Sequence, residues 1–284
     1  MTQSTDYLLW TLLRGLFVIY ALIVGGVYLL QRKLQYFPNP QEVSSPLGSE
    51  YLDLKTVQLV SDDGTTTFSW YWPSPGPLTL VFFHGNGGNR GNRLSWIQEF
   101  HRRGYGVFIL DYRGYGGSAG TPTENGFYQD GQAAIDWLRE NTHQQLIYFG
   151  ESLGSGVAVE MAIRHPPAAL IIQSGFSSAV DVARKSYPYL PVSLIMKDRY
   201  ESLKKIDGLT CPLLVIHGQG DSTIPFKLVT ALYEAAPGPK DWFLVPKANH
   251  NDVASVGGQS YWNRIENFLL TQVITSPKNP LRAE

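Results

Sequence analysis

Short apolar runs alternate with longer, partly polar segments along the chain from residue 78 onward. The runs have the length and the β-branched or aromatic content of buried strands. We expect strands at residues 78–83, 106–112, 146–149, 168–174, 213–217 and 242–245. Segments with helical spacing or composition lie at residues 92–103, 124–140, 153–165, 226–236 and 260–273. This order predicts an α/β fold with a mainly parallel sheet and helices on both faces, in which sites lie beyond the carboxyl ends of the strands.

Two further strands are predicted before this alternation begins. Residues 56–60 and 68–72 flank the turn-forming segment SDDGTTT, so we expect an antiparallel hairpin at one edge of the sheet. The chain has 284 residues, of which 43% are hydrophobic, and this is enough to bury one large core. We therefore expect a single α/β domain at residues 51–284.

The amino-terminal segment has a different pattern, because residues 7–30 are apolar on all sides and carry a single charge, Arg14. At about 1.5 Å per helical residue, this stretch is long enough to cross a hydrocarbon core of roughly 30 Å. The following residues, QRKLQYFP, contain no small residues suited to signal-peptide cleavage. We expect residues 1–33 to be an uncleaved membrane anchor and residues 34–50, rich in proline and serine, to be a linker. Arg14 and the amino terminus lie toward one side of the span and Arg32 with Lys33 on the other, so its orientation is not predicted.

Composition and motif content exclude several classes of function. The formal net charge is −1 and no basic run occurs, so the electrostatic footprint of a nucleic-acid-binding protein is missing. Cys211 is the only cysteine, which excludes an internal disulfide. Histidine and cysteine do not cluster at metal-ligand spacing, and neither G-x-G-x-x-G nor G-x-x-x-x-G-K-[ST] is present. We expect no metal and no organic cofactor.

A serine lies between glycines directly after the predicted strand at residues 146–149. Residues 150–154 read GESLG and are followed by a helical pattern. A strand that runs straight into a helix needs a sharp, strained turn, and glycines let the two backbones approach closely. Ser152 would then be exposed at the carboxyl end of the strand. An ordinary loop containing serine is the alternative, so the interpretation depends on whether partners follow other strands.

A base and an acid do follow later strands. His250 comes five residues after residues 242–245, and Asp221 comes four residues after residues 213–217. The chain order Ser152, Asp221, His250 is that of the α/β-hydrolases, and the other five histidines all precede Asp221. We favour Asp221 as the acid on its loop position. Asp181 is the alternative.

A nucleophilic serine also needs hydrogen-bond donors for the oxyanion that develops in the reaction. The loop at residues 84–93, HGNGGNRGNR, follows the first predicted parallel strand, where this fold supplies one backbone N–H. We choose Asn86 as this donor and Leu153, next to the nucleophile, as the second. A phosphate-binding loop is the competing interpretation, and the missing nucleotide motifs disfavour it.

Seven ordered motifs extend from the anchor almost to the end of the chain. They are LQYFP (34–38), HGNGGNR (84–90), DYRGYGGSAGTPTENG (111–126), GESLGSG (150–156), the stretch at 176–206, HGQGD (217–221) and NHND (249–252). Together they resemble the membrane-anchored branch of the α/β-hydrolases whose domain is labelled serine-aminopeptidase-like. The resemblance implies Ser152 as nucleophile, Asp221 as acid, His250 as base, and Asn86 with Leu153 as oxyanion donors. It implies no particular substrate, because this fold supports esterases, lipases, thioesterases and peptidases.

The segment at about 176–210 is too long for a simple crossover between strands and is rich in aromatic and aliphatic residues, so we expect a small cap over Ser152. The function that we expect is a membrane-anchored serine hydrolase that cleaves a carboxylic ester or thioester. Anchoring through residues 7–30 would raise the local concentration of lipid-like acyl substrates. One alternative is a serine peptidase or aminopeptidase, with Glu201 as the best amine-binding candidate. The other is a membrane-tethered scaffold without catalysis.

Overall fold

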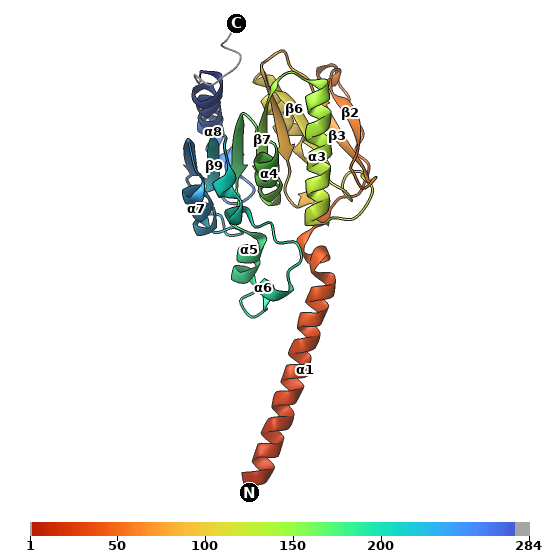
Figure 1. Ribbon diagram of the computed structural model, residues 1–284, viewed down its shortest axis with the longest axis vertical. Helices are drawn as coiled ribbons and strands as arrows, with labels where there is room; N and C mark the ends of the chain where they lie inside the picture. Colours follow the sequence, from red (N-terminus) through yellow and green to blue (C-terminus); the bar gives the residue numbers. More distant parts are fainter. Residues whose placement is uncertain (1, 276–284) are drawn as a thin grey trace.

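The computed structural model describes residues 2–275, and its central feature is an eight-stranded sheet with the order β10-β9-β8-β7-β4-β6-β3-β2 (Figure 1). The strands are β2 (Lys55–Val60), β3 (Thr66–Trp72), β4 (Leu78–Phe83), β6 (Gly106–Leu110), β7 (Gln145–Glu151), β8 (Ala169–Gln173), β9 (Leu213–Gly218) and β10 (Lys240–Val245). Neighbouring strands from β10 to β6 are parallel, whereas β3 is antiparallel to β6 and β2 is antiparallel to β3. The predicted hairpin and the six predicted parallel strands are confirmed.

Helices cover both faces of the sheet. The long ones are α2 (Leu94–Arg102), α3 (Glu124–Asn141), α4 (Leu153–Arg164), α7 (Phe226–Ala235) and α8 (Val253–Leu269). Along β4, Val81 and Phe83 belong to the buried cluster that also contains residues of α3, α4 and α7, while Leu80 and Phe82 belong to the cluster that contains residues of α2 and α8. Because both faces are covered, every residue of β4 is buried, which explains why its sequence is apolar without alternation. The predicted α/β class and parallel sheet are confirmed.

Helix α8 begins earlier than the sequence pattern predicts. It starts at Val253 instead of residue 260, and Gly258, with φ of 51°, breaks it into two parts. The first part contains two adjacent glycines and several small or polar residues, so its helical period is not visible in the sequence. A short π-helical turn, Leu270–Ile274, follows the second part.

The chain begins with a single long helix, α1 (Thr2–Gln35), which extends away from the body of the domain (Figure 1). The part from Asp6 to Gln35 contains an 18-residue window of mean hydropathy 2.0, and none of this window is buried by the rest of the chain. The helix is therefore long and apolar enough to cross a membrane.

The chain after α1 packs directly on the domain. Tyr36 is 3% exposed, and its hydroxyl lies 2.9 Å from that of Tyr200. The next two residues form β1 (Phe37–Pro38), which pairs in parallel with β5 (Gly87–Gly88) in the loop after β4. The first part of the segment predicted as a linker is thus held against the loop predicted to carry an oxyanion donor.

A cap-like segment separates β8 from β9. It contains α5 (Ala179–Ser186), α6 (Val192–Ile195) and two short 3-10 turns, Ser202–Lys204 and Ile206–Gly208. In Figure 1 the helices α5 and α6 lie on the same side of the domain as α1. We use the term cap for residues 176–210.

Candidate active site

Ser152 occupies the sharp turn between β7 and α4. Its φ of 50° and ψ of −118° lie in a region that L-residues rarely adopt. A Cβ on Gly154 would lie 2.0 Å from the carbonyl oxygen of Phe83, and a Cβ on Gly150 would lie 2.6 Å from Cα of Ser155. Both glycines are therefore required by the close approach of strand and helix, which holds the serine at the carboxyl end of the sheet.

The structure brings Ser152, His250 and Asp221 together in one line of hydrogen bonds. Oγ of Ser152 lies 2.9 Å from Nε2 of His250, and Nδ1 of His250 lies 2.7 Å from Oδ2 of Asp221. The three side chains come from the segments that follow β7, β10 and β9, although they are separated by 29 to 98 positions in the sequence. The His250 side chain is 11% exposed and that of Asp221 is 1% exposed, so the line runs from a partly open serine to a buried carboxylate.

The Asp221 carboxylate is held in its charged form. Burial by itself would raise the pKa of Asp221, but hydrogen bonds from His250 and from the Ile224 N–H outweigh this effect and lower it. The Oδ1 atom accepts hydrogen bonds from the N–H groups of Thr223 and Ile224 at 2.9 and 2.8 Å. The charge therefore faces Nδ1 of His250, which fixes the imidazole tautomer that leaves Nε2 free to accept a proton from Ser152.

Asp181, the alternative acid, lies elsewhere. It is in α5, where it accepts hydrogen bonds from the hydroxyls of Ser177 and Ser178 and pairs with Arg184. Its contacts cap the first turn of α5, a position at which acidic residues are common. The structure places Asp221, not Asp181, beside His250.

The two predicted oxyanion donors, Asn86 and Leu153, line the same cavity as Ser152. Within residues 2–275, neither the backbone N–H of Asn86 nor that of Leu153 forms a hydrogen bond. Leu153 is the first residue of α4, and the N–H of a first helical residue has no partner within its helix. Asn86 is held against the chain at the end of α1, because its side chain donates to the carbonyl of Gln35 at 2.9 Å and its carbonyl accepts from the N–H of Phe37 at 3.0 Å.

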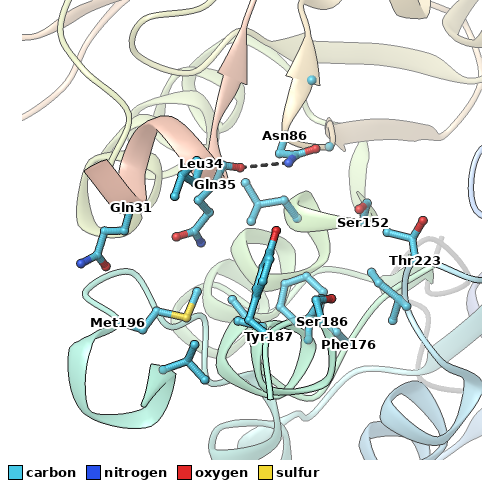
Figure 2. A pocket seen from close by; sticks show the side chains of 18 of the residues that line it. Gln31, Leu34, Gln35, Asn86, Ser152, Phe176, Ser186, Tyr187, Met196 and Thr223 are labelled. Carbon is cyan, nitrogen blue, oxygen red and sulfur yellow. Dashed lines mark hydrogen bonds between the residues drawn. The ribbon is translucent and has the colours of Figure 1, made fainter. Parts of the chain in front are cut away.

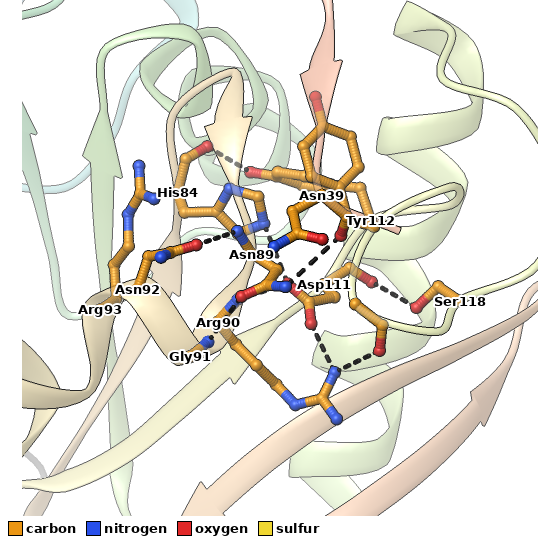
Figure 3. Close-up of polar contacts among 12 residues, drawn as sticks. Asn39, His84, Asn89, Arg90, Gly91, Asn92, Arg93, Asp111, Tyr112 and Ser118 are labelled. Carbon is orange, nitrogen blue, oxygen red and sulfur yellow. Dashed lines mark hydrogen bonds and ion pairs between the residues drawn. The ribbon is translucent and has the colours of Figure 1, made fainter. Parts of the chain in front are cut away.

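A buried polar network holds the glycine-rich loop at residues 84–93 (Figure 3). The backbone N–H of Arg90 donates to Oδ1 of Asp111 at 2.6 Å, and its guanidinium pairs with Oδ2 of the same residue. The guanidinium also donates to the carbonyls of Gly116 and Val43 at 2.9 and 2.8 Å. The side chains of Arg90 and Asp111 are 1% exposed or less. Each therefore neutralises the buried charge of the other, which would be costly without a partner.

Sequence reasoning overlooked a second pair that joins this loop to the serine turn. Arg93 donates from Nη2 to Oε2 of Glu151 at 3.2 Å and from Nη1 to the carbonyl of Gly87 at 2.8 Å. Glu151 directly precedes the predicted nucleophile, and the motif GESLG by itself assigns it no role. The only signal for its role was that opposite charges occur in two motifs that the fold brings together.

A cavity of about 790 Å³ opens beside Ser152 and His250. Figure 2 shows Ser152 and Thr223 at one end and Gln31 and Met196 at the other, with Tyr187 between them. Its volume lies within the usual range for small-molecule sites, and the cap contributes more of its lining residues than any other segment, most of them apolar. In the described part of the chain, no group of three or more histidine, cysteine, aspartate or glutamate residues is arranged to hold a metal.

Sheet order, serine turn and strand-end residues define the class of protein. A family model described as the alpha/beta hydrolase fold matches residues 79–192. A protein of Mycobacterium tuberculosis is 38% identical over 263 residues, covering 88% of this chain and 92% of its own. The alpha/beta hydrolase domain-containing protein WAV2 of Arabidopsis thaliana is 30% identical over 87% of this chain and 91% of its own. This chain belongs to the α/β-hydrolase family.

The solved structures agree on the fold. An esterase of Pyrococcus furiosus superposes with a TM-score of 0.69 and covers 83% of this chain and 97% of its own, at 20% sequence identity. At this identity the likeness concerns the fold alone. Family membership and fold together support a hydrolase.

Proposed function

We propose that this chain is a membrane-anchored serine hydrolase that cleaves a carboxylic ester or thioester. Ser152 attacks the carbonyl carbon while Nε2 of His250 takes the hydroxyl proton, and the oxyanion accepts hydrogen bonds from the N–H groups of Asn86 and Leu153. Collapse of this intermediate breaks the C–O or C–S bond, and His250 gives its proton to the leaving alcohol or thiol. Water, deprotonated by His250, then releases the carboxylic acid from Ser152.

The observation that carries this proposal is the line of hydrogen bonds from Ser152 through His250 to Asp221, with distances of 2.9 and 2.7 Å, at the wall of a large cavity. Nucleophilic catalysis by serine needs a base within hydrogen-bond reach and a third group that orients the base. A scaffold without catalysis has no physical need for this line of groups or for the strained turn at Ser152.

The charges around the cavity favour an ester or thioester over a peptide amino terminus. Within the described part of the chain, the one carboxylate that lines the cavity is Glu151, and Arg93 already pairs with it. Glu201, the predicted amine-binding candidate, does not line the cavity. The Lys204 ammonium and the Arg199 guanidinium bind Glu201 and hold its pKa below the usual value. A cationic substrate amine would therefore enter a site without an available anionic partner.

Labelling with a fluorophosphonate probe tests the catalytic proposal. We expect folded full-length protein to react covalently with the probe and Ser152→Ala to remain unlabelled, because the probe needs an activated serine. Ser186→Ala is the matched control, since Ser186 also lines the cavity but has no base beside it. Folded wild-type protein that stays unlabelled, while a known serine hydrolase is labelled, would favour the scaffold.

The same proposal assigns α1 as a retained membrane anchor. Its length and apolar composition suit a membrane span, and Tyr36 begins the packed domain one residue after the helix ends. We expect the protein to stay in membranes after an alkaline carbonate wash and its intact mass to include residues 1–33. Loss of these residues from the mature protein would identify α1 as a cleaved signal sequence.

A further inference from the structure

One wall of the active-site cavity comes from α1 itself. Ile23, Val27 and Leu34 line the cavity, and their spacing of four and seven residues places them on one face of the helix. The cavity that contains Ser152 and His250 therefore continues along the apolar helix that is suited to a membrane.

The opposite wall is the cap, which is attached to α1 along several turns. Near the domain, Gln31 donates to the carbonyl of Ile195 at 3.0 Å and accepts from the N–H of Lys197 at 2.7 Å. Farther along the helix, the Tyr20 hydroxyl donates to the carbonyl of Tyr189 at 2.8 Å. These contacts satisfy backbone groups of the cap with side chains of α1, which is the requirement for irregular backbone at membrane depth.

These attachments place the tip of the cap beside the apolar part of α1. From Arg32 to Tyr20 the helix rises by about 18 Å, at about 1.5 Å per residue. This is more than half of a hydrocarbon core of roughly 30 Å. Tyr187 and Tyr189 of the tip are exposed, and Leu194 is 86% exposed. An exposed apolar tip beside a membrane-spanning helix is stable when lipid covers it.

Charged groups lie where the apolar part of α1 and the cap meets the main domain. The Lys197 ammonium lies 4.2 Å from the ring centroid of Tyr28, and Arg32 pairs with Asp198. Aromatic and basic residues of this kind are typical of the membrane–water interface. The polar end of the cavity, at Ser152 and His250, then lies on the domain side of these charged groups, while the walls formed by Ile23 and Val27 lie on the membrane side.

Resting on the function proposed above, we infer that the substrate is a long-chain acyl ester or thioester resident in the bilayer. Its acyl chain occupies the passage between α1 and the cap, and its carbonyl reaches Ser152 without the molecule leaving the membrane. The apolar lining binds the chain, and the interfacial position of Ser152 matches the depth at which ester and thioester groups of membrane lipids and acylated proteins lie. The anchor is thus part of the substrate site.

Chain-length selectivity in proteoliposomes tests this passage. Full-length protein is reconstituted in phosphatidylcholine vesicles and given 4-nitrophenyl butyrate or 4-nitrophenyl palmitate, which share one leaving group. We expect Val27→Trp to lower the ratio of palmitate to butyrate turnover at least tenfold, because the indole fills the passage. Leu29→Trp is the matched control, since Leu29 is on α1 and exposed but does not line the cavity. We expect it to leave the ratio at its wild-type value.

Surface dilution tests the route of entry. The total concentration of 4-nitrophenyl palmitate is held constant while more phosphatidylcholine is added. We expect the hydrolysis rate to fall as the mole fraction of the palmitate ester in the membrane falls. A rate that follows total concentration, or equal ratios for Val27→Trp, Leu29→Trp and wild type, would overturn the bilayer passage. If the folded wild-type protein does not hydrolyse 4-nitrophenyl butyrate, the serine hydrolase proposal is overturned as well.

Two sources can present such an acyl chain, and separate arms of the experiment distinguish them. One arm supplies dipalmitoylglycerol in the vesicles, and the other supplies an S-palmitoylated cysteine peptide inserted in the same vesicles. Faster release of palmitate from the first identifies a lipid ester, and faster release from the second identifies a protein thioester. No release from either would overturn the inference.

Discussion

Arg32, at the end of α1, pairs with Asp198 of the cap across 166 sequence positions, with Nε 2.8 Å from Oδ2. The Asp198 carboxylate also accepts a hydrogen bond from the backbone N–H of Glu124, the first residue of α3, at 3.1 Å. The side chain of Asp198 is 6% exposed, whereas that of Arg32 is 48% exposed. This one carboxylate therefore joins α1, the cap and the main domain.

Replacement of Asp198 should loosen this junction. We expect Asp198→Ala to lower the free energy of unfolding by about 1–3 kcal/mol, because the N–H of Glu124 loses its acceptor in a partly buried position. Thermal unfolding in detergent micelles measures the effect as a lower Tm. Asp207→Asn is the control, since in the described structure its side chain forms no hydrogen bond. Equal Tm values for the two variants would show that the junction adds no stability.

The serine and its base should each be indispensable for turnover. We expect Ser152→Ala and His250→Ala each to lower kcat on a small soluble ester by about 10⁴-fold, because nucleophile and base act as one unit. Steady-state kinetics measures the loss, and circular dichroism checks that the fold is unchanged. If either folded variant keeps more than a tenth of wild-type turnover, its assignment is wrong.

The acid is tested by a pair of isosteric changes. We expect Asp221→Asn to lower kcat by about 10³ to 10⁴-fold, because an amide at this position favours the wrong imidazole tautomer and leaves the imidazolium without a counter-charge. Asp181→Asn should change turnover little, since Asp181 lies in the first turn of α5, where its carboxylate accepts a hydrogen bond from the N-cap residue Ser178. The opposite order of effects in the kinetic comparison would transfer the acid role to Asp181.

The pH dependence of stability should reveal the ion pair between Asp63 and Arg113. The hydrogen bond from the Arg113 guanidinium lowers the pKa of Asp63 from 3.8 to about 2. Because the folded-state pKa is depressed, the stabilisation is fully present above the unfolded-state pKa and is lost as pH falls toward about 2. We expect Asp63→Asn to have a lower Tm than wild type at pH 6.

That difference in Tm should narrow between pH 4 and pH 2, the window defined by the two pKa values. Asp62→Asn is the control, because the described structure records no ion pair for the neighbouring Asp62. A difference between Asp63→Asn and wild type that stays constant over the whole range would contradict the assigned pKa shift.

Local sequence patterns determined the elements of this fold and the residues of the candidate site. A fully buried parallel strand such as Leu78–Phe83 is apolar throughout, and a strained turn needs the glycines at positions 150 and 154, so both leave a direct trace in the sequence. The order of Ser152, Asp221 and His250 identified their positions at strand ends, and parallel strands bring those ends to one edge of the sheet. The long apolar helix that contains residues 7–30 was likewise visible, because hydropathy is a local property of the sequence.

Tertiary structure alone decided how α1 and the cap meet. Tyr36 was predicted to lie in the linker at residues 34–50, yet it is buried in the domain, where its hydroxyl pairs with that of Tyr200, 164 positions away. Val27 was predicted only as part of an apolar span, yet it lines the cavity that contains Ser152. Such contacts depend on the path of the whole chain, and no local period or spacing encodes them, because an apolar residue satisfies the same pattern whether it faces lipid, the core or a substrate.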